Sequence, residues 1–250
     1  MTRVVLTQPL PRVERTAARL AERGHEVLLC PLRRLVPQAD VAAAIGPLAE
    51  CDWVVFVSPG AVAVALQALP GGWPRRTGIA LIGPGSEQEL ADHGISAPAV
   101  RIVRPGCAPY DADALLRLAP FDSPRGLRVL VLAGTGGRTD WIDELGRRGA
   151  LVRRASIYRS EALSPADEVL RRIRRWSRDG REALFVFTTT DAVRELEQAL
   201  AGARLRGWAR RQHALAQHPR IAGLLDERGW RSTRLIEPGE RALLAAIESV

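Results

Sequence analysis

The sequence predicts an α/β protein of two doubly wound, flavodoxin-like parallel-sheet domains. Short apolar runs alternate with segments of helical spacing, which is typical of parallel sheets covered by helices. A strand–helix–strand unit that opens at Arg3 recurs at Arg128, and WVVFVSPGAV (Trp53–Val62) is echoed by LFVFTTTDAV (Leu184–Val193). With 250 residues, 46% of them hydrophobic, the chain is long enough for two domains of roughly 100–150 residues.

The first half of the chain carries five predicted strands. The helix after the first strand places Val13, Ala17 and Leu20 on one face and is stopped by Gly24. Further on, Ser86 with Glu89 predicts a capping box, and Asp111 predicts the cap of a short helix. The strands are expected at Val4–Thr7, Glu26–Cys30, Trp53–Val57, Ile79–Ile82 and Ala99–Val103.

The second half supplies five more strands, for a predicted total of ten. The unit Arg128–Tyr158 comes first, and Ser164 then predicts a helix cap with Pro165 at the first helical position. Strands follow from Leu184 and His213, and Thr233–Ile236 precedes a last helix after Pro238. Two extended stretches, near 31–38 and 155–165, are predicted to be linkers.

The charge of the chain is strongly basic. Its formal net charge is +8, and every one of its 36 basic residues is arginine. Arginine binds carboxylates and phosphates with paired hydrogen bonds, so we expect an anionic partner; codon bias also explains such a count. Arg-rich segments at 171–181 and 204–212 leave nucleic acid as an alternative partner, although solvated helix faces explain them better.

The three cysteines are far apart and predict neither a disulfide framework nor a zinc site. Arg3, Pro9, Pro11 and Arg12 interrupt the start of the chain, and no run of 18 apolar residues occurs in it. We therefore expect a soluble cytoplasmic protein that does not bind a membrane.

Small, hydroxylated or glycine-containing turns follow the predicted strands. Ligands of open parallel sheets bind at the carboxyl ends of the strands, and backbone N–H groups at helix starts attract anions. We therefore predict an anion-binding rim, although such turns also serve as plain helix caps. The turns are Thr7–Pro9, Ser58–Gly60, Gly83–Ser86, Gly134–Arg138, Thr188–Thr190 and Gln217–Arg220.

The known sequence motifs for nucleotide binding, nucleophilic catalysis and metal binding are not found. The chain contains neither G-x-G-x-x-G nor a Walker A motif nor a G-x-S-x-G elbow. His213 and His218 form the nearest histidine pair, but their spacing does not predict a metal site. We expect no cofactor and no metal, and an enzyme that works by positioning and electrostatics.

In their order and spacing, these turns resemble those of the uroporphyrinogen-III synthase family. The likeness spans the whole chain and is carried by VVLTQP, FVSPGAV, LIGPGSEQELADHG, GGRTDWIDELGRRGALV, the tyrosine of IYR, FTTTDAV and HPRIAGLLDERG. The resemblance implies two domains, residues 1–34 with 162–250 and residues 37–157, joined by two extended strands, with the active-site cleft between the domains.

The implied reaction is the cyclisation of hydroxymethylbilane to uroporphyrinogen III, with inversion of ring D and loss of water. By the same resemblance Tyr158 is the catalytic residue that donates to the departing hydroxyl. The residues implied to bind the linear tetrapyrrole octacarboxylate are Thr7, Gln8, Ser58, Pro59, Gly60, Gly83, Ser86, Gly136, Gly137, Arg138, Thr188, Thr189, Thr190, His218, Arg220 and Ile221.

The chain departs from the family pattern at four of these positions. Gln8 stands where many relatives have arginine, and Thr189 replaces a common serine. His218 and Ile221 replace the glycine and a threonine of a G-P-T-T turn seen in some relatives. The alternative is therefore a non-catalytic ligand-binding or regulatory paralogue.

We expect a monomer that takes its substrate over from hydroxymethylbilane synthase.

Overall fold

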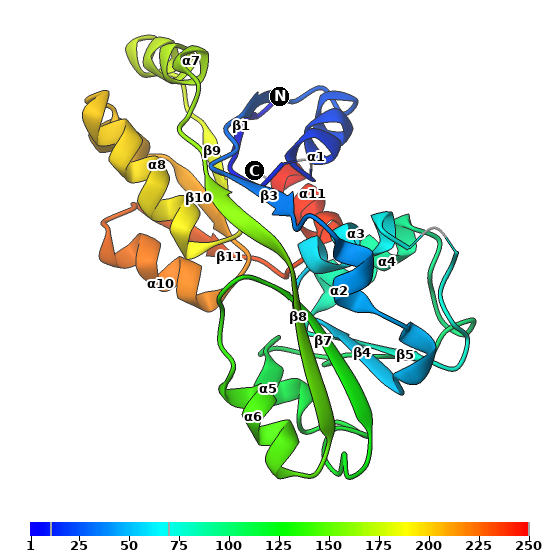
Figure 1. The fold of residues 1–250 in the computed structure, drawn as a ribbon. Helices are drawn as coiled ribbons and strands as arrows, with labels where there is room; N and C mark the ends of the chain where they lie inside the picture. Colours follow the sequence, from blue (N-terminus) through cyan, green and yellow to red (C-terminus); the bar gives the residue numbers. More distant parts are fainter. Residues whose placement is uncertain (11, 70, 250) are drawn as a thin grey trace. The chain divides into compact units, whose positions relative to one another are not determined.

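The computed structural model describes residues 1–10, 12–69 and 71–249, which form two compact α/β units (Figure 1). One unit comprises Met1–Leu35 together with Glu161–Val250, and the other comprises Val36–Ser160. None of the helices in the described ranges is long and apolar enough to cross a membrane.

The first unit is built on a five-stranded parallel sheet. Its strands lie in the order β11-β10-β9-β1-β2, which is the flavodoxin-like order of doubly wound sheets. The elements are β1 (Arg3–Leu6), α1 (Arg12–Ala21), β2 (Glu26–Leu29), α7 (Asp167–Arg178), β9 (Leu184–Phe187), α8 (Thr190–Gly202), α9 (Arg206–Ala209), β10 (His213–Ala216), α10 (Pro219–Glu227), β11 (Ser232–Leu235) and α11 (Glu240–Glu248).

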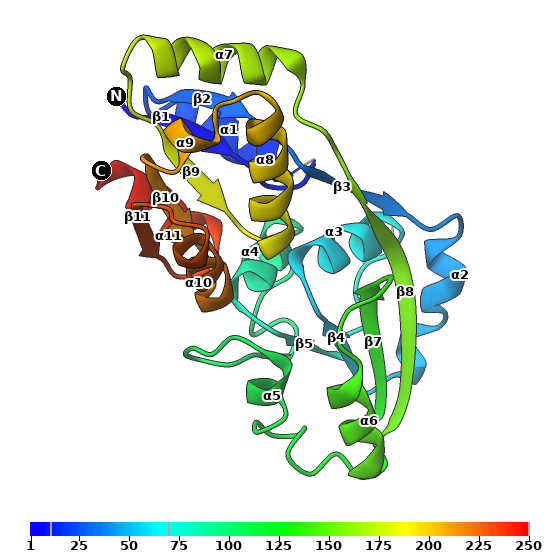
Figure 2. The same ribbon diagram turned by 90° about the vertical axis from the view of Figure 1, so that its left-hand side faces the viewer.

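Alternation along these strands divides the apolar side chains between the two faces of the sheet. Val5, Phe185 and Phe187 point to the face that α7, α8, α9 and α10 cover. Val4 and Leu184 point to the opposite face, where α1 and α11 pack. Figure 2 shows α7 alongside β2. The sheet is therefore buried on both sides, as its continuous apolar strands predict.

The second unit contains a six-stranded sheet in the order β3-β8-β7-β4-β5-β6. Without β3, the order is that of the other common doubly wound fold, 3-2-1-4-5. The elements are β3 (Arg33–Pro37), α2 (Val41–Ile45), a 3₁₀ turn (Leu48–Glu50), β4 (Trp53–Phe56), α3 (Pro59–Gln67), β5 (Gly78–Leu81), α4 (Pro84–Asp92), β6 (Ile102–Val103), α5 (Ala112–Leu115), β7 (Arg128–Gly134), α6 (Asp140–Arg147) and β8 (Leu151–Ala162).

The two faces of this sheet also carry separate cores. Val54, Phe56 and Leu130 pack under α2, α3 and α4, whereas Val55 and Val131 pack under α5 and α6. The predicted doubly wound α/β class is confirmed, because the strands other than β3 pair in parallel and both sheets are covered on both faces.

The two predicted extended linkers are strands that pair with each other. β3 and the long β8, green in Figure 1, are hydrogen-bonded neighbours. Leu163 N–H donates to Leu32 O at 2.7 Å, and Gln38 N–H donates to Ile157 O at 3.0 Å. The pairing raises the strand count of the described residues from the predicted ten to eleven, because an extended segment beside another satisfies its backbone by joining the sheet.

Two predicted helix starts are wrong and one is confirmed. Helix α7 begins at Asp167 after Ala166, so Ser164 does not cap it. Helix α4 begins at Pro84 after Gly83, which places Ser86 inside the first turn rather than at the cap. Asp111 does cap α5, since its carboxylate accepts from Ala114 N–H at 2.8 Å.

Candidate active site

All six predicted rim turns begin at or just beyond the carboxyl end of a parallel strand. Three belong to the first unit, after β1, β9 and β10, and three belong to the second, after β4, β5 and β7. Each turn leads into a helix, so backbone N–H groups of helix starts lie along the carboxyl edge of each sheet.

Each sheet has one point where its strand order reverses direction. In the first sheet this switch point lies between β1 and β9, and in the second it lies between β4 and β7. Connections leave the two neighbouring strands to opposite faces there, and ligands of open parallel sheets bind at such points. The turns that begin at Ser58 and Gly134 flank the switch point of the second sheet.

A β-bulge sets the position of Tyr158. The register between β7 and β8 pairs Ala133 with Ser156 and then Gly134 with Tyr158, so Ile157 is the extra residue. Bulges re-aim side chains and are frequent beside active sites. A Cβ built on Gly134 would lie only 2.7 Å from Tyr158 Cε2, so the tyrosine ring crosses β7 where that strand lacks a side chain.

The hydroxyl of Tyr158 meets Ser58 at the switch point. Tyr158 Oη and Ser58 Oγ are 3.0 Å apart, although their strands β8 and β4 are separated by β7. Ser58 is also the N-cap of α3, where its Oγ accepts from Ala61 N–H at 3.1 Å. The positive end of the α3 dipole favours negative charge at this hydroxyl pair.

The turn after β7 is held by Arg154. Its Nη2 donates to Gly134 O at 2.9 Å and to Gly136 O at 2.7 Å. Gly136 and Gly137 both have φ of +85°, a backbone conformation that favours glycine. The fixed backbone of this turn therefore has a specific sequence requirement, unlike an ordinary exposed loop.

Arg138, predicted to bind substrate, is an exposed residue of this turn with acidic neighbours. Its Nη2 lies 2.5 Å from Asp140 Oδ2, and its Nη1 lies 3.4 Å from Asp113 Oδ2. The hydrogen bond from Arg138 lowers the pKa of Asp140. A substrate carboxylate would therefore compete with these two aspartates for the guanidinium.

Gly83 and Ser86 lie in the third turn at this edge. They offer a ligand their backbone groups rather than their side chains. Ser86 is buried, whereas Gly83 packs under Tyr110, whose Cβ would lie 3.3 Å from an added Cβ. Both tyrosines of the chain thus lie over glycines at the carboxyl edge of this sheet. Sequence reasoning missed Tyr110, although a second rare tyrosine close to a glycine-rich set of turns was a usable signal.

The first unit places its predicted residues at three strand ends. Thr7 is buried and donates from Oγ1 to Val186 O at 2.6 Å. Thr189 caps α8 by accepting from Ala192 N–H at 3.1 Å. Gln8 follows Thr7 and is fully buried. Thr188 and Thr190 are half-buried beside the cap.

The turn after β10 contains three of the predicted residues. His218 caps α10, with its Nδ1 accepting from Arg220 N–H at 3.1 Å, and Arg220 is exposed. Ile221, predicted to bind substrate, instead packs its side chain in the apolar core and donates its N–H to His218 O. The side chain of Ile221 therefore faces the core, and its role in substrate binding stays a prediction.

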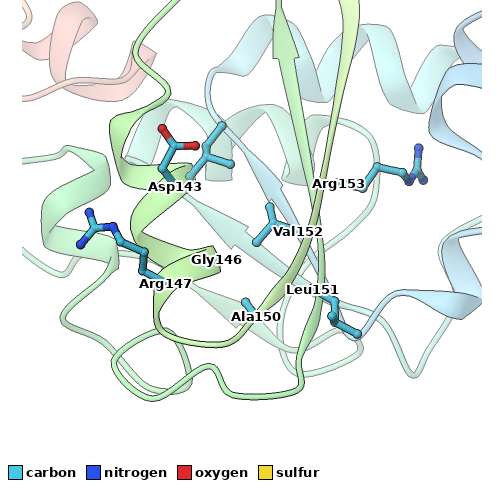
Figure 3. A pocket seen from close by; sticks show the side chains of 8 residues that line it. Asp143, Gly146, Arg147, Ala150, Leu151, Val152 and Arg153 are labelled. Carbon is cyan, nitrogen blue, oxygen red and sulfur yellow. The ribbon is translucent and has the colours of Figure 1, made fainter.

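One hollow in the second unit is lined by other residues than these turns. It has a volume of about 750 Å³ and is lined by the end of α6 and the start of β8 (Figure 3). Tyr158 lies near the other end of β8. Within the hollow, Arg153 turns toward the backbone of α2, donating to Ala44 O at 2.8 Å. Among the described residues, no convergent polar set marks this hollow as a site.

Comparison with known proteins agrees with the arrangement of turns. A family model described as uroporphyrinogen-III synthase HemD matches residues 14–240. The chain belongs to the uroporphyrinogen-III synthase family. Uroporphyrinogen-III synthases of Salmonella typhimurium and Escherichia coli are each 28% identical to it, and each alignment covers 98% of this chain and 99% of the relative.

Solved members of the family share the fold. A mutant uroporphyrinogen III synthase from the extremely thermophilic bacterium Thermus thermophilus superposes with a TM-score of 0.55 at 19% identity, over 100% of this chain and 98% of that chain. The enzyme from Helicobacter pylori gives a TM-score of 0.54 at 13% identity, over 100% and 99%. The sequence-based assignment to the family is confirmed.

Proposed function

We propose that this chain cyclises hydroxymethylbilane to uroporphyrinogen III, inverting ring D and releasing water. Membership of the family over residues 14–240 supports the reaction. The observation that carries the assignment to this site is the Tyr158–Ser58 hydroxyl pair, 3.0 Å apart at a switch point. A hydroxyl pair at the edge of a parallel sheet suits proton donation to a leaving group.

The reaction requires the protein to donate a proton and to hold the substrate in position. Tyr158 gives its phenolic proton to the departing hydroxyl, the C–O bond breaks, and water leaves. The electron-rich pyrroles stabilise the resulting cation and supply the nucleophile, and the proton lost on ring closure returns to the Tyr158 oxygen. Ser58 can donate to that oxygen meanwhile, because the helix cap uses its Oγ only as an acceptor from Ala61 N–H and leaves its proton available.

The carboxylates of the substrate are proposed to bind along the two rims. Helices α3, α4, α8 and α10 begin at predicted rim turns, and each presents backbone N–H groups there. Hydroxyls and arginines beside them add donors, although Arg138 is shared with Asp113 and Asp140. The proposed substrate contacts are Thr7, Gln8, Ser58, Pro59, Gly60, Gly83, Ser86, Gly136, Gly137, Arg138, Thr188, Thr189, Thr190, His218 and Arg220.

The proposal also covers the source of the substrate, the cellular compartment and the oligomeric state. Hydroxymethylbilane is unstable toward spontaneous ring closure, so a direct hand-over from hydroxymethylbilane synthase would protect it. We propose a cytoplasmic monomer that receives the substrate in this way. Sedimentation of the purified chain alone and with the synthase tests both points, and a stable homodimer would contradict the first.

The proposed reaction is tested by identifying which isomer of the product forms. The chain is supplied with hydroxymethylbilane generated enzymatically, the products are oxidised, and the I and III isomers are separated by chromatography. We expect isomer III in excess over the isomer I that forms spontaneously. Isomer I alone, from a folded protein, would remove the proposed activity and leave a non-catalytic ligand-binding protein.

The hydroxyl pair is tested by substitution. We expect Tyr158→Phe to lower kcat by about 10- to 100-fold, within the usual range for general acid catalysis, with KM little changed. Ser58→Ala should lower kcat less, because Tyr158 keeps its proton, while the lost helix cap reduces stability by about 1 kcal/mol.

Ser58→Thr is the matched control for this pair. Threonine keeps both the hydroxyl and the capping function, so activity and melting temperature should approach those of the natural protein. If Tyr158→Phe and Ser58→Ala both leave kcat unchanged, the hydroxyl pair has no part in the reaction.

A further inference from the structure

Gln8 has an unusual environment for an uncharged polar residue. Its side chain is 0% exposed, and neither Oε1 nor Nε2 has a hydrogen-bond partner among the described residues. Buried amides are nearly always paired, and the exceptions require an explanation. The fold does not need a polar side chain here, because a leucine of similar size would fill the same space without unpaired atoms.

Two other buried glutamines show how the fold treats an amide that it uses. Gln212 accepts from Ala183 N–H at 3.0 Å and donates to Trp208 O at 3.2 Å. Gln217, at the end of β10, donates to Gly239 O at 3.0 Å. Gln8 has the same side chain and comparable burial but no such partner, so its amide has no structural role within the described protein.

The location of Gln8 links the unpaired amide to the rim. It lies just beyond the carboxyl end of β1, which neighbours β9 at the switch point of the first sheet. Thr7 beside it is fixed by its hydrogen bond to Val186 O. Leu10, after it, is fixed by donation of its N–H to Arg33 O at 3.1 Å. The amide thus stands between two anchored residues where ligands of such sheets bind.

We propose that Gln8 is a substrate-recognition residue that forms hydrogen bonds with both a carboxylate and the adjacent pyrrole of the linear tetrapyrrole. Nε2 donates to a carboxylate oxygen, and Oε1 accepts from a pyrrole N–H. The inference rests on the proposed function and deepens it. An arginine here would offer donors alone, whereas the amide offers one atom for each of the two groups.

The proposal separates stability from binding, which gives the test. Gln8→Leu removes two unpaired buried atoms, so the melting temperature without ligand should rise, by about 3 °C for a chain of this size. The same variant should raise KM for hydroxymethylbilane about tenfold with kcat little changed. Gln8→Met, unbranched like glutamine, serves as a second variant should leucine fit poorly.

Gln212→Leu is the matched control. It makes the same chemical change at a buried amide that is paired, so its melting temperature should fall and its KM should stay at the natural value. Comparison of the two variants isolates the unpaired state of Gln8 from the general effect of replacing a buried glutamine. A fall in melting temperature for both Gln8→Leu and Gln8→Met, or an unchanged KM, would overturn the proposal.

A binding measurement keeps this inference distinct from the catalytic one. Uroporphyrin III carries both carboxylates and pyrrole N–H groups, and it should raise the melting temperature of the natural protein and of Gln212→Leu. Gln8→Leu should lose most of that rise. If the natural protein yields isomer I alone yet shows this pattern, the catalytic proposal fails and Gln8 recognition stands; equal rises in all three proteins contradict Gln8 recognition.

Discussion

At the scale of the residue, Gly134 matters because of what it lacks. Tyr158 lies on β8 and its partner Ser58 follows β4, with β7 between them. Neighbouring strands are about 4.8 Å apart, so the tyrosine has to cross β7 to reach the serine. Any side chain at Gly134 would occupy the path of the ring.

Gly134→Ala is therefore expected to displace the ring and break the Tyr158–Ser58 contact. An added Cβ at 2.7 Å from the ring cannot be accommodated without a shift. The expected result is a kcat reduced about tenfold or more, with stability lowered by about 1–3 kcal/mol for overpacking. Steady-state kinetics and denaturant unfolding measure the two effects.

Gly146→Ala provides the control at a glycine with open space. Gly146 lies within α6, and a Cβ there meets nothing within 4 Å. Alanine should raise stability by about 0.5–1 kcal/mol and leave kcat alone. If Gly134→Ala keeps full activity, the position of the Tyr158 ring over Gly134 is not required for the reaction.

At the scale of the element, an ion pair fixes β7 against β4 at their amino ends. Asp52 precedes β4 and accepts from Arg128 N–H at 2.8 Å and from Arg128 Nη2 at 3.0 Å. Asp52 N–H in turn donates to Arg128 O at 2.9 Å. This contact sets the register of the two strands that flank the switch point.

The pairing makes stability depend on pH in a defined direction. The side-chain and backbone hydrogen bonds from Arg128 lower the pKa of Asp52. A lowered folded-state pKa contributes stability above the ordinary value of about 3.9, and this contribution is lost as the pH falls through the folded-state pKa. Asp52→Asn should therefore cost about 1 kcal/mol at neutral pH and progressively less in acid.

Urea unfolding between pH 3 and pH 7 measures this effect. Asp122→Asn is the control, because Asp122 is exposed and its carboxylate has no partner among the described contacts. Its stability should follow that of the natural protein at every pH. An Asp52→Asn penalty that stays constant across the range would contradict an ionic role for the contact.

At the scale of the whole molecule, two units with separate cores are joined by the paired β3 and β8. Cys30 lies in the core of the first unit, Cys51 is half-buried in the second, and Cys107 is exposed. Burial raises the pKa of the Cys30 thiol to about 12. The three thiols therefore report on different parts of the chain.

We expect a thiol reagent at pH 8 to modify Cys107 at once and Cys30 only when the first unit unfolds. The raised pKa of Cys30 also means that its contribution to stability is present below about 8.5 and is lost as the pH climbs toward the folded value. Cys30→Ala should flatten that alkaline decline, and Cys107→Ala should not. Fast labelling of Cys30 in the native protein would contradict its burial.

The sequence by itself determined the class of the fold and predicted the sheet edges at which we propose the site. Continuous apolar strands such as Leu184–Phe187 and glycine-bearing turns are local signals, and local signals survive in a single sequence. The same signals placed six turns at carboxyl ends of strands, whereas Tyr158 was singled out by the family resemblance. They failed at Ser86 and Ser164, because capping patterns compete with the packing that fixes where a helix begins.

Only the tertiary structure decided how those residues meet. The bulge at Ile157 aims Tyr158 across Gly134, and a bulge arises from pairing with a strand distant in sequence, which leaves no local pattern. The sequence places Ile221 in a turn, but its side chain packs in the core. The sequence also predicts that Gln8 is an ordinary polar turn residue, but its amide is buried without a partner among the described residues. Burial is a property of the assembled fold, so these assignments required the structure.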